Sequence, residues 1–267
     1  MPPLDRFLSK AVAIAPIVRA LALETSVGSC SLALLPVNLL PSGICCFSWR
    51  ANGLYIPKSF ATADRTSCHD IIRNNPLGII FVSDSSGFAA DHVPLILQPS
   101  LDQVAPDKLY GHVARANPLA HKGTQPISTL TVFQGLDHYI SPNGYATKKE
   151  SGKVVPTWNY EAVHVHGRLT IIDDPAWLLG FLERLTNTHE ATQSHPWKVQ
   201  DAPREYLEAL LNAIVGFEIV VERYEGKLKL SQNQPEQNRD SLVDYLKQLG
   251  SQDAQAMAQK ITAQHRS

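Results

Sequence analysis

The sequence has few cysteines and no framework for them. The four cysteines among its 267 residues are Cys30, Cys45, Cys46 and Cys68, and no two of them form a C-x-x-C pair. Such spacing indicates neither a set of disulfides nor a zinc site. We interpret them as reduced thiols, which are typical of a cytoplasmic protein.

An excess of either charge is also absent. Lysine and arginine number 24 against 25 aspartates and glutamates, so the formal net charge is -1. A protein that holds a polyanion by bulk electrostatics normally carries a basic footprint. The balance argues against that kind of nucleic-acid binding and leaves room only for a local basic patch.

Long apolar runs and the common catalytic motifs are missing as well. No stretch reaches the roughly 18 uninterrupted apolar residues of a membrane-spanning helix. The apolar run 11–23 superficially resembles a signal peptide, but Arg19 interrupts it and Asp5 lies in its lead. There is no G-x-G-x-x-G, P-loop, G-x-S-x-G or H-E-x-x-H, which argues against a Rossmann dehydrogenase and a hydrolase.

The most informative stretch that is present is Val154–Leu169, V-V-P-T-W-N-Y-E-A-V-H-V-H-G-R-L. After Pro156 it predicts a long strand, in which Tyr160, His164 and His166 share one face. An indole, an amide, a phenol and two imidazoles lie within nine positions. A strand built only for packing would be richer in Val and Ile, so we interpret this one as a wall of a ligand site.

The H-x-H pair allows two interpretations. His164 and His166 can supply two metal ligands, but a metal site needs a third and usually a fourth donor. His92, His112 and His138 are candidates whose positions the sequence does not fix. We prefer the alternative, in which the two imidazoles are solvated or hydrogen-bonded and no metal is bound.

From Leu54 onward the chain predicts short strands joined by tight turns. This spacing is typical of an antiparallel barrel or sandwich. The strands are expected at Leu77–Val82, Phe88–Leu97, Lys108–Ala114, Ile127–Phe133, His138–Ser141, Phe217–Tyr224 and Lys227–Leu230, with Gly135 and Glu225-Gly226 as breaks and Lys148–Lys153 as a charged loop.

Four helical segments are also predicted. Their signals are a capping side chain at Thr62 and at Asp174, apolar stripes in the second and third segments, and a proline or glycine at several of the ends. They are Thr62–Asn74, a helix that begins at Asp174-Pro175, Pro203–Val215 with Gly216 as a left-handed cap, and the polar segment Ser241–His265 with a break at Gly250.

Two polar clusters lie outside the long strand. In Gly111–Pro118, Arg115 offers a planar fork of donors that suits a phosphate, and backbone amides at a helix start would add to it. A surface arginine beside an Asn-capped turn explains the same residues equally well. In Lys229–Asn233 polar groups gather at a predicted strand end, where they line a pocket or simply solvate the strand.

Specific motifs connect these segments to a known family. P-T-W-N-Y followed by V-H-V-H-G is highly specific, and so is K-L-S-Q-N. The others are Tyr55-Ile56-Pro57, His92-Val93-Pro94-Leu95, Gly111-His112 through Asn117-Pro118, Phe133-Gln134-Gly135 with His138-Tyr139-Ile140-Ser141, Trp197-Lys198 and Ile214-Val215-Gly216. Together, over nearly all of residues 54–267, they resemble the PaiB family of FMN-binding negative transcriptional regulators.

The resemblance implies a fold and a cofactor site. It implies a mainly β, α+β flavin split barrel: an antiparallel Greek-key barrel with flanking helices, in a homodimer that holds FMN between its subunits. DNA is a further partner by resemblance only. Candidates for the phosphate side are His112, Arg115 and Asn117, with His92 on the first strand of the site. Candidates for the flavin ring are Gln134, Tyr139, Thr157, Trp158 and Asn159.

Three positions depart from what the family usually has. Asp91 replaces a threonine and would repel a phosphate, Gly144 replaces a tryptophan and removes an aromatic wall, and Gln234 replaces an arginine. These departures predict that FMN binding is weakened or lost. An NAD(P)H-dependent flavin oxidoreductase on the same fold is the alternative function, and a haem or metal binder is a third.

Residues 1–53 do not match the rest of the chain. The family usually begins with a methionine at the position of Leu54, so we expect a mistranslated leader or a disordered extension before it. The remaining chain divides into a split-barrel domain at 54–235 and a C-terminal helical segment at 236–267.

Overall fold

The computed structural model describes residues 53–266, except 63, 86, 102, 103, 123 and 124. The expected leader or extension therefore lies outside the described residues, apart from Gly53. None of the described helices is long and apolar enough to cross a membrane.

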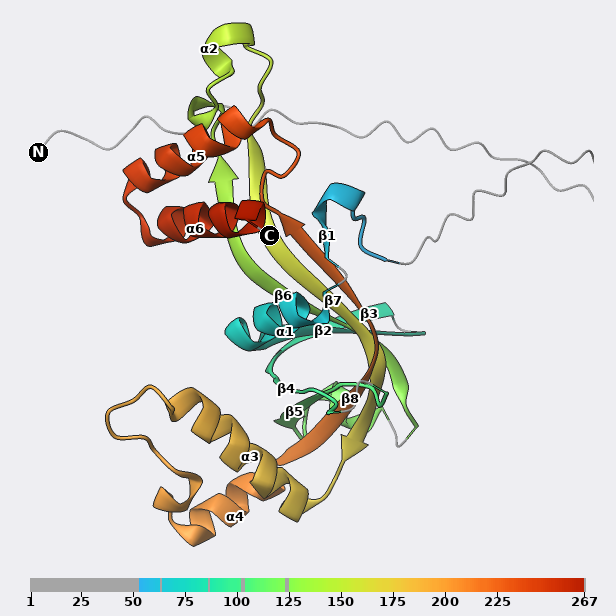
Figure 1. The fold of residues 1–267 in the computed structure, drawn as a ribbon. Helices are drawn as coiled ribbons and strands as arrows, with labels where there is room; N and C mark the ends of the chain where they lie inside the picture. Colours follow the sequence, from blue (N-terminus) through green and yellow to red (C-terminus); the bar gives the residue numbers. More distant parts are fainter. Residues whose placement is uncertain (1–52, 63, 86, 102–103, 123–124, 267) are drawn as a thin grey trace, which may run out of the picture. The chain divides into compact units, whose positions relative to one another are not determined.

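One antiparallel sheet organises the described part of the chain (Figure 1). Its strands follow the order β3-β2-β6-β7-β8-β5-β4, and β1 pairs with β8. They are β1 (Ala61–Thr62), β2 (Leu77–Asp84), β3 (Gly87–Pro94), β4 (Ile96–Gln98), β5 (Lys108–Ala114), β6 (Ile127–Ile140), β7 (Thr157–Ile172) and β8 (Ile214–Lys229).

The sheet closes into a barrel through β3 and β4. Only Leu95 separates these two strands along the chain. Because β3 pairs with β2 and β4 pairs with β5, one extended stretch of chain joins the two ends of the strand order. The expected antiparallel split barrel with flanking helices is confirmed.

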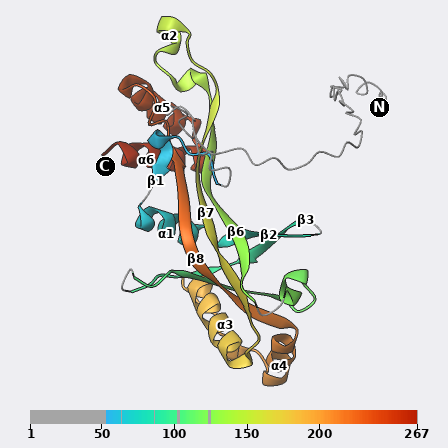
Figure 2. The ribbon, with the colours of Figure 1, turned by 90° about the vertical axis from the view of Figure 1, so that its right-hand side faces the viewer.

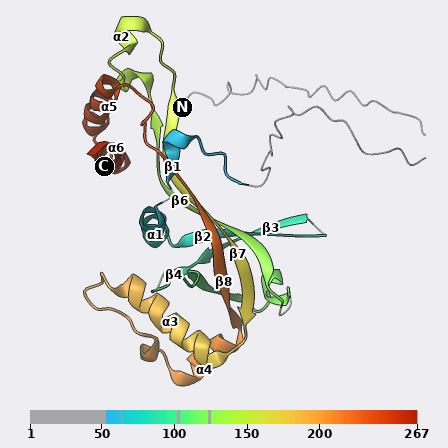
Figure 3. The same ribbon diagram turned by 45° about the vertical axis from the view of Figure 1, so that its right-hand side comes forward.

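The long strands β6, β7 and β8 run past the barrel and carry helices at both ends (Figures 2 and 3). α3 and α4 lie at one end, and α2, α5 and α6 lie at the other. The helices are α1 (Arg65–Asn74), α2 (Lys148–Ser151), α3 (Pro175–Glu190), α4 (Arg204–Asn212), α5 (Glu236–Leu249) and α6 (Gln252–Arg266), with short 3-10 turns η1 (Lys58–Phe60), η2 (Pro118–His121), η3 (Pro142–Gly144) and η4 (Val199–Asp201).

Two predicted breaks in the strands are wrong. Gly135 does not end a strand, because a bulge between Gln134 and Asp137 absorbs it and β6 continues to Ile140. Glu225-Gly226 is not a turn, because β8 pairs with β7 on both sides of it, from Gly216 to Lys229. In both cases the uninterrupted partner β7 keeps the neighbouring strand straight enough to pair.

Several predicted helix boundaries are also wrong. Thr62 belongs to β1, and the carboxylate of Asp64 caps α1 by accepting from the amides of Thr66 and Ser67. The expected loop at Lys148–Lys153 contains the short helix α2. By contrast, the Asp174 cap, the positive φ of 74° at Gly250 and the stop at Asn75-Pro76 are confirmed.

Gly216 does not cap a helix. α4 ends at Asn212, and Gly216 lies inside β8. A Cβ atom at this position would lie 2.3 Å from the Trp177 ring, so a glycine is needed for the close approach of α3. The apolar signal at Ile214 and Val215 that prolonged the predicted helix belongs to this strand.

Two hydrophobic cores stabilise the fold. One fills the barrel, where Phe133, Val163, Val165, Phe217 and Ile219 are fully buried. The other lies beyond the barrel, under the C-terminal helices. Its members are Ile140, Tyr145, Leu230, Leu242, Leu246, Ala254, Met257, Ala258 and Ile261. The burial of apolar surface against β6 and β8 therefore attaches α5 and α6 to the strands.

A buried carboxylate joins α1 to the sheet. The side chain of Asp107 is 1% exposed and accepts hydrogen bonds from Arg65 Nε at 2.8 Å and Tyr224 OH at 2.6 Å. It also accepts from the amide of Ser100 at 2.8 Å and lies 2.7 Å from His69 Nε2. Burial alone would raise the pKa of Asp107, but these donors outweigh it and hold that pKa far below its usual value.

The first prediction concerns this carboxylate. Asp107→Asn removes the charge that compensates Arg65, so we expect a loss of about 3 kcal/mol in the free energy of unfolding. Denaturant-induced unfolding followed by circular dichroism measures it. The matched control is Asp173→Asn, which breaks an exposed ion pair with Arg115 and should cost much less. Equal losses in the two variants would contradict a special role for Asp107.

The difference in the free energy of unfolding between wild type and Asp107→Asn should also depend on pH. The pKa of Asp107 is lower in the folded than in the unfolded chain, so its contribution to stability is complete above the unfolded pKa. That contribution is lost as pH falls toward the folded pKa. The gap between wild type and Asp107→Asn should therefore stay constant above about pH 5 and shrink below about pH 4. A gap that does not change with pH would show that the charge is not what matters.

Candidate functional site

Seven of the nine predicted site residues form two groups that lie far apart within one chain. His112, Arg115 and Asn117 lie at the end of β5, where Gly216 is the partner of both His112 and Ile172. Tyr139, Thr157, Trp158 and Asn159 lie at the other end of β6 and β7. Between positions 158 and 172 the strand β7 covers about 45 Å. This is far longer than one FMN molecule.

The group at the far end of β6 and β7 contains an exposed aromatic pair. Tyr139 and Trp158 face each other across β6 and β7, with ring centroids 5.9 Å apart and planes 69° apart. They are 47% and 53% exposed. Large aromatic side chains are usually buried, so this exposed pair offers apolar ring faces against which a planar ligand can pack.

Polar groups support this pair from behind. Asn159 is fully buried and donates from Nδ2 to Ser231 Oγ at 2.9 Å. Lys229 Nζ donates to the Trp158 carbonyl at 2.6 Å and to Thr157 Oγ1. Burial lowers the pKa of Lys229. The amide and the ammonium thus fix the backbone on which Trp158 is displayed.

Lys229 and Ser231 were not among the predicted site residues. Both belong to the K-L-S-Q-N segment, which the sequence marked as a polar cluster at a strand end and as a family motif but without a role in the site. Ser231 has a positive φ of 63°, the one such non-glycine residue among those described. Gln232 closes the turn, because its side chain accepts from Leu230 N and donates to the Leu228 carbonyl. The segment therefore makes specific contacts with the strand that carries Trp158.

Gln134 lies nearer to the barrel than the aromatic pair. It stands at the bulge of β6, is exposed, and donates from Nε2 to Asp137 Oδ2 at 2.8 Å. Its partner across the sheet is Ala162 on β7.

At the other end, His112 has an unsatisfied polar atom. Its ring packs edge-on against Phe181 with centroids 5.7 Å apart, and its Nδ1 is buried without a hydrogen-bond partner. Burial lowers the pKa of His112, which keeps the ring neutral at neutral pH. An orphaned buried nitrogen is costly, and it is consistent with a bound group that completes the site.

The guanidinium of Arg115 is already engaged. It forms a two-pronged ion pair with Asp173, at 2.8 Å and 2.5 Å, and Nε donates to the Asn212 carbonyl at 2.9 Å. All three contacts fix the connections around α3 and α4 to the end of β5. A phosphate would have to compete with Asp173 for this fork.

Asn117 and Asp91 contact each other. Asn117 Oδ1 accepts from the Leu119 amide and caps η2, while Nδ2 donates to Asp91 Oδ1 at 2.9 Å. The carboxylate that we expected to repel a phosphate is thus hydrogen-bonded to a predicted phosphate ligand. His92 follows on β3 and is exposed.

The two other departures from the family lie near α5. A Cβ atom on Gly144 would lie 2.8 Å from Leu242 Cδ1 and 3.0 Å from Tyr245 Cδ1. α5 therefore occupies space that a larger residue would need. Gln234 accepts from Asn238 Nδ2 and, through its carbonyl, from Arg239 Nη1.

The H-x-H pair has partners other than a metal. His166 Nε2 lies 3.1 Å from Glu225 Oε2, and that oxygen also accepts from the amide of Leu54 at 2.8 Å. Burial lowers the pKa of His164. Among the residues that the structure describes, no group of three His, Cys, Asp or Glu side chains could hold a metal ion. The metal hypothesis therefore gains no support.

Comparison with known proteins defines the class. Residues 54–223 match the model of a family described as "Putative FMN-binding domain". This is more than half of the chain, so the chain belongs to that family of FMN-binding domains, and FMN is the cofactor of the domain.

Curated relatives cover most of the chain. An uncharacterized protein of Emericella nidulans is 31% identical over an alignment of 238 residues, and the match covers 77% of this chain and 95% of that protein. The Bacillus subtilis protein named "Protease synthase and sporulation protein PAI 2" is 29% identical over 206 residues, again 77% of this chain and 95% of that one.

Solved structures give weaker matches. The FAD and heme binding protein from Mycobacterium smegmatis has 14% sequence identity and a TM-score of 0.46, and the match covers 63% of this chain and 73% of that one. A flavocytochrome from Azotobacter vinelandii has 16% identity and a TM-score of 0.45, with 63% and 69% coverage.

The residues present fit FMN at the ring end. The exposed Tyr139–Trp158 surface suits the isoalloxazine, and Lys229 lies beside it. The phosphate end fits through the orphaned Nδ1 of His112, whereas Arg115 is free for a phosphate only if Asp173 releases it.

This competition gives the second prediction. If Arg115 holds the phosphate, Arg115→Gln should weaken FMN binding about tenfold or more. Asp173→Asn, which frees the same fork, should leave the affinity unchanged or raise it. Quenching of flavin fluorescence measures both, with thermal unfolding as the control for folding. Unchanged affinity in both variants would assign Arg115 to the α3–α4 connection alone.

Proposed function

We propose that this chain is a PaiB-type FMN-binding protein that works as a homodimer and as a negative regulator of transcription. The family match supports FMN. The observation that carries the proposal is the exposed Tyr139–Trp158 pair with Lys229 and Asn159 fixed behind it. Bound FMN supplies a redox-active ring, and the chain's own residues position and shield that ring.

The homodimer is supported by the distance between the two groups. The candidates for the flavin ring (Tyr139, Thr157, Trp158 and Asn159) and the candidates for the phosphate (His112, Arg115 and Asn117) are too far apart in one chain to hold one FMN molecule. A two-fold axis would instead bring the ring candidates of one chain close to the phosphate candidates of its partner. Each dimer would then hold two equivalent composite sites.

Apolar surface that one chain leaves uncovered supports the same assembly. β3 is an edge strand with most of its residues exposed, and Phe88 on it is 88% exposed. α4 has no buried residue although it is strongly amphipathic. Its stripe includes Tyr206, which is 60% exposed, and Leu210, which is 45% exposed. Exposed apolar surface of this extent is typical of an interface.

Regulation of transcription is carried over from the family resemblance. The name of the Bacillus subtilis relative refers to protease synthesis and sporulation, which is in keeping with a regulatory role for that protein. The net charge of -1 favours regulation through a ligand or a partner over bulk electrostatic binding to DNA. No contact around the aromatic pair favours the alternative function, a flavin-dependent oxidoreductase. A cytoplasmic location stays a prediction.

The third prediction tests the composite site. Trp158→Ala should weaken FMN binding about tenfold, because it removes a stacking surface. If Arg115→Gln also loses FMN, the two variants can be mixed and their subunits exchanged. Half of the dimers are then heterodimers with one intact site, so FMN capacity should recover to about one quarter of the wild-type value.

The visible spectrum of the purified full chain, followed by release of the flavin on heating, measures that capacity. No recovery after exchange, with each variant still dimeric by sedimentation, would place both groups in a site formed within one chain and contradict the composite arrangement.

The fourth prediction concerns DNA. Direct phosphate contacts would give a steep fall of affinity with salt, because each contact releases condensed counterions. We expect a shallow slope in filter binding with DNA from upstream of the chain's own gene. A slope corresponding to about six or more contacts would show direct binding and replace regulation through a ligand or partner.

A further inference from the structure

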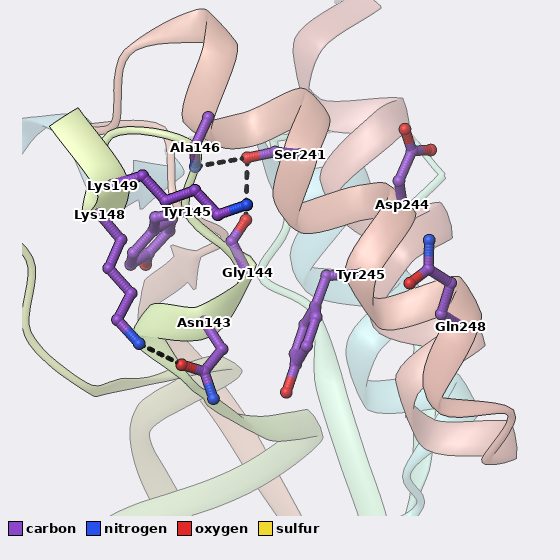
Figure 4. Close-up of a pocket in the computed structure, with 10 residues that line it drawn as sticks. All are labelled: Asn143, Gly144, Tyr145, Ala146, Lys148, Lys149, Ser241, Asp244, Tyr245 and Gln248. Atoms are coloured by element: carbon purple, nitrogen blue, oxygen red, sulfur yellow. Dashed lines mark hydrogen bonds between the residues drawn. The ribbon is translucent and has the colours of Figure 1, made fainter.

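A second site lies outside both groups, in a groove between the β6–β7 connection and α5 (Figure 4). Its volume is about 810 Å³, which is within the usual range for small-molecule sites. On one side η3 and α2 contribute Asn143, Lys148 and Lys149. On the other side α5 contributes a stripe of polar side chains. These are Ser241, Asp244, Tyr245 and Gln248.

The stripe on α5 faces the groove, and of its members only Tyr245 also packs against the second core. Residues at i, i+3, i+4 and i+7 lie on one side of a helix, so Ser241, Asp244, Tyr245 and Gln248 face the groove together. Leu242 and Leu246, on the opposite side, are fully buried in the second core. Polar and apolar residues are thus divided between the groove and the core.

Hydrogen bonds between the two walls of the groove fix their relative position. Ser241 Oγ donates to the Gly144 carbonyl at 2.8 Å and accepts from the Ala146 amide at 3.0 Å. Asn238 Oδ1 accepts from the Thr147 amide at 3.0 Å. These bonds fix α5 to the connection without any ligand, and a preformed site loses less entropy on binding.

Charge is distributed unevenly across the groove. Lys148 and Lys149 are on the α2 wall, where Lys148 donates to Asn143 Oδ1. Among the described residues the Lys149 ammonium has no hydrogen-bond or ion-pair partner. Asp244 is on the α5 wall. An anionic group is therefore attracted to one wall only, and the other wall accepts hydrogen bonds from a ligand that has donors.

The Tyr245 ring lies between the lysines and the carboxylate. Because Gly144 has no side chain, the ring packs directly over its backbone, with Cδ1 only 3.0 Å from where a Cβ would be. Figure 4 shows Tyr245 between Asn143 and the residues of α5. A planar heteroaromatic ring can stack on such a side chain.

We propose that this groove binds a nucleoside phosphate as a second ligand, with the phosphate at Lys148 and Lys149 and the base on Tyr245. Asp244 and Gln248 then meet the edge of the base. A carboxylate accepts from N–H groups, which favours guanine with its adjacent N–H donors. The site goes beyond the proposed function, and its residues are not those assigned to FMN.

The test is calorimetric titration of the FMN-saturated full chain with GMP, with AMP as the comparison. We expect one GMP per chain and weaker binding of AMP. The double variant K148Q/K149Q should bind GMP about tenfold less tightly, because two charge-assisted contacts are lost. Lys153→Gln is the matched control, since this lysine follows α2 but does not line the groove, and it should bind GMP as wild type does.

Two further variants separate recognition from folding. Tyr245→Leu should weaken GMP and AMP alike, and Asp244→Asn should reduce the preference for GMP without weakening the phosphate contact. Absence of binding heat, an equal effect of Lys153→Gln, or displacement of FMN by GMP would each overturn the proposal. Displacement that K148Q/K149Q leaves unchanged would place GMP in the flavin site rather than in the groove.

Discussion

The pairing of β7 along its whole length is the constraint on which the rest of this structure depends. From Thr157 to Leu169 it has β6 on one side, and from Tyr160 to Ile172 it has β8 on the other. Both neighbours must therefore stay extended over the same distance. The barrel, the strands beyond it and the two sets of helices are arranged along this one ladder of backbone hydrogen bonds.

The same ladder explains which predictions from the sequence failed. Glycine at positions 135 and 226 normally weakens a strand, and local rules therefore indicated breaks. Tertiary pairing with β7 overrides that preference, through a bulge at Gln134–Asp137 and continuous register at Gly226. The helix signal at Ile214 and Val215 failed for the same reason, because apolar residues suit a buried strand as well as a helix.

Other features could be predicted because their causes are local. The Asp174 cap with Pro175, the stop at Asn75-Pro76 and the break at Gly250 depend on side chains within one turn of the backbone they affect. The site was predictable in part. Specific motifs indicated Tyr139, Trp158 and Asn159, and K-L-S-Q-N was a motif as well. No local signal showed that Lys229 and Ser231 contact residues 72 positions earlier in the chain. No short-range signal shows that Asp173 occupies the fork of Arg115.

Gly144 connects the flavin end of the molecule with the groove. Without a side chain at this position, Tyr245 and Leu242 pack against the β6–β7 connection, and that connection begins directly after Tyr139 and Ile140. Ile140 belongs to the same core as Leu242, so α5 and the strand that displays Tyr139 form one packed unit. A ligand that shifts α5 must therefore shift the aromatic pair as well. By linkage, a ligand that acts on both through this packed unit changes the affinity for FMN by the same factor by which FMN changes the affinity for that ligand.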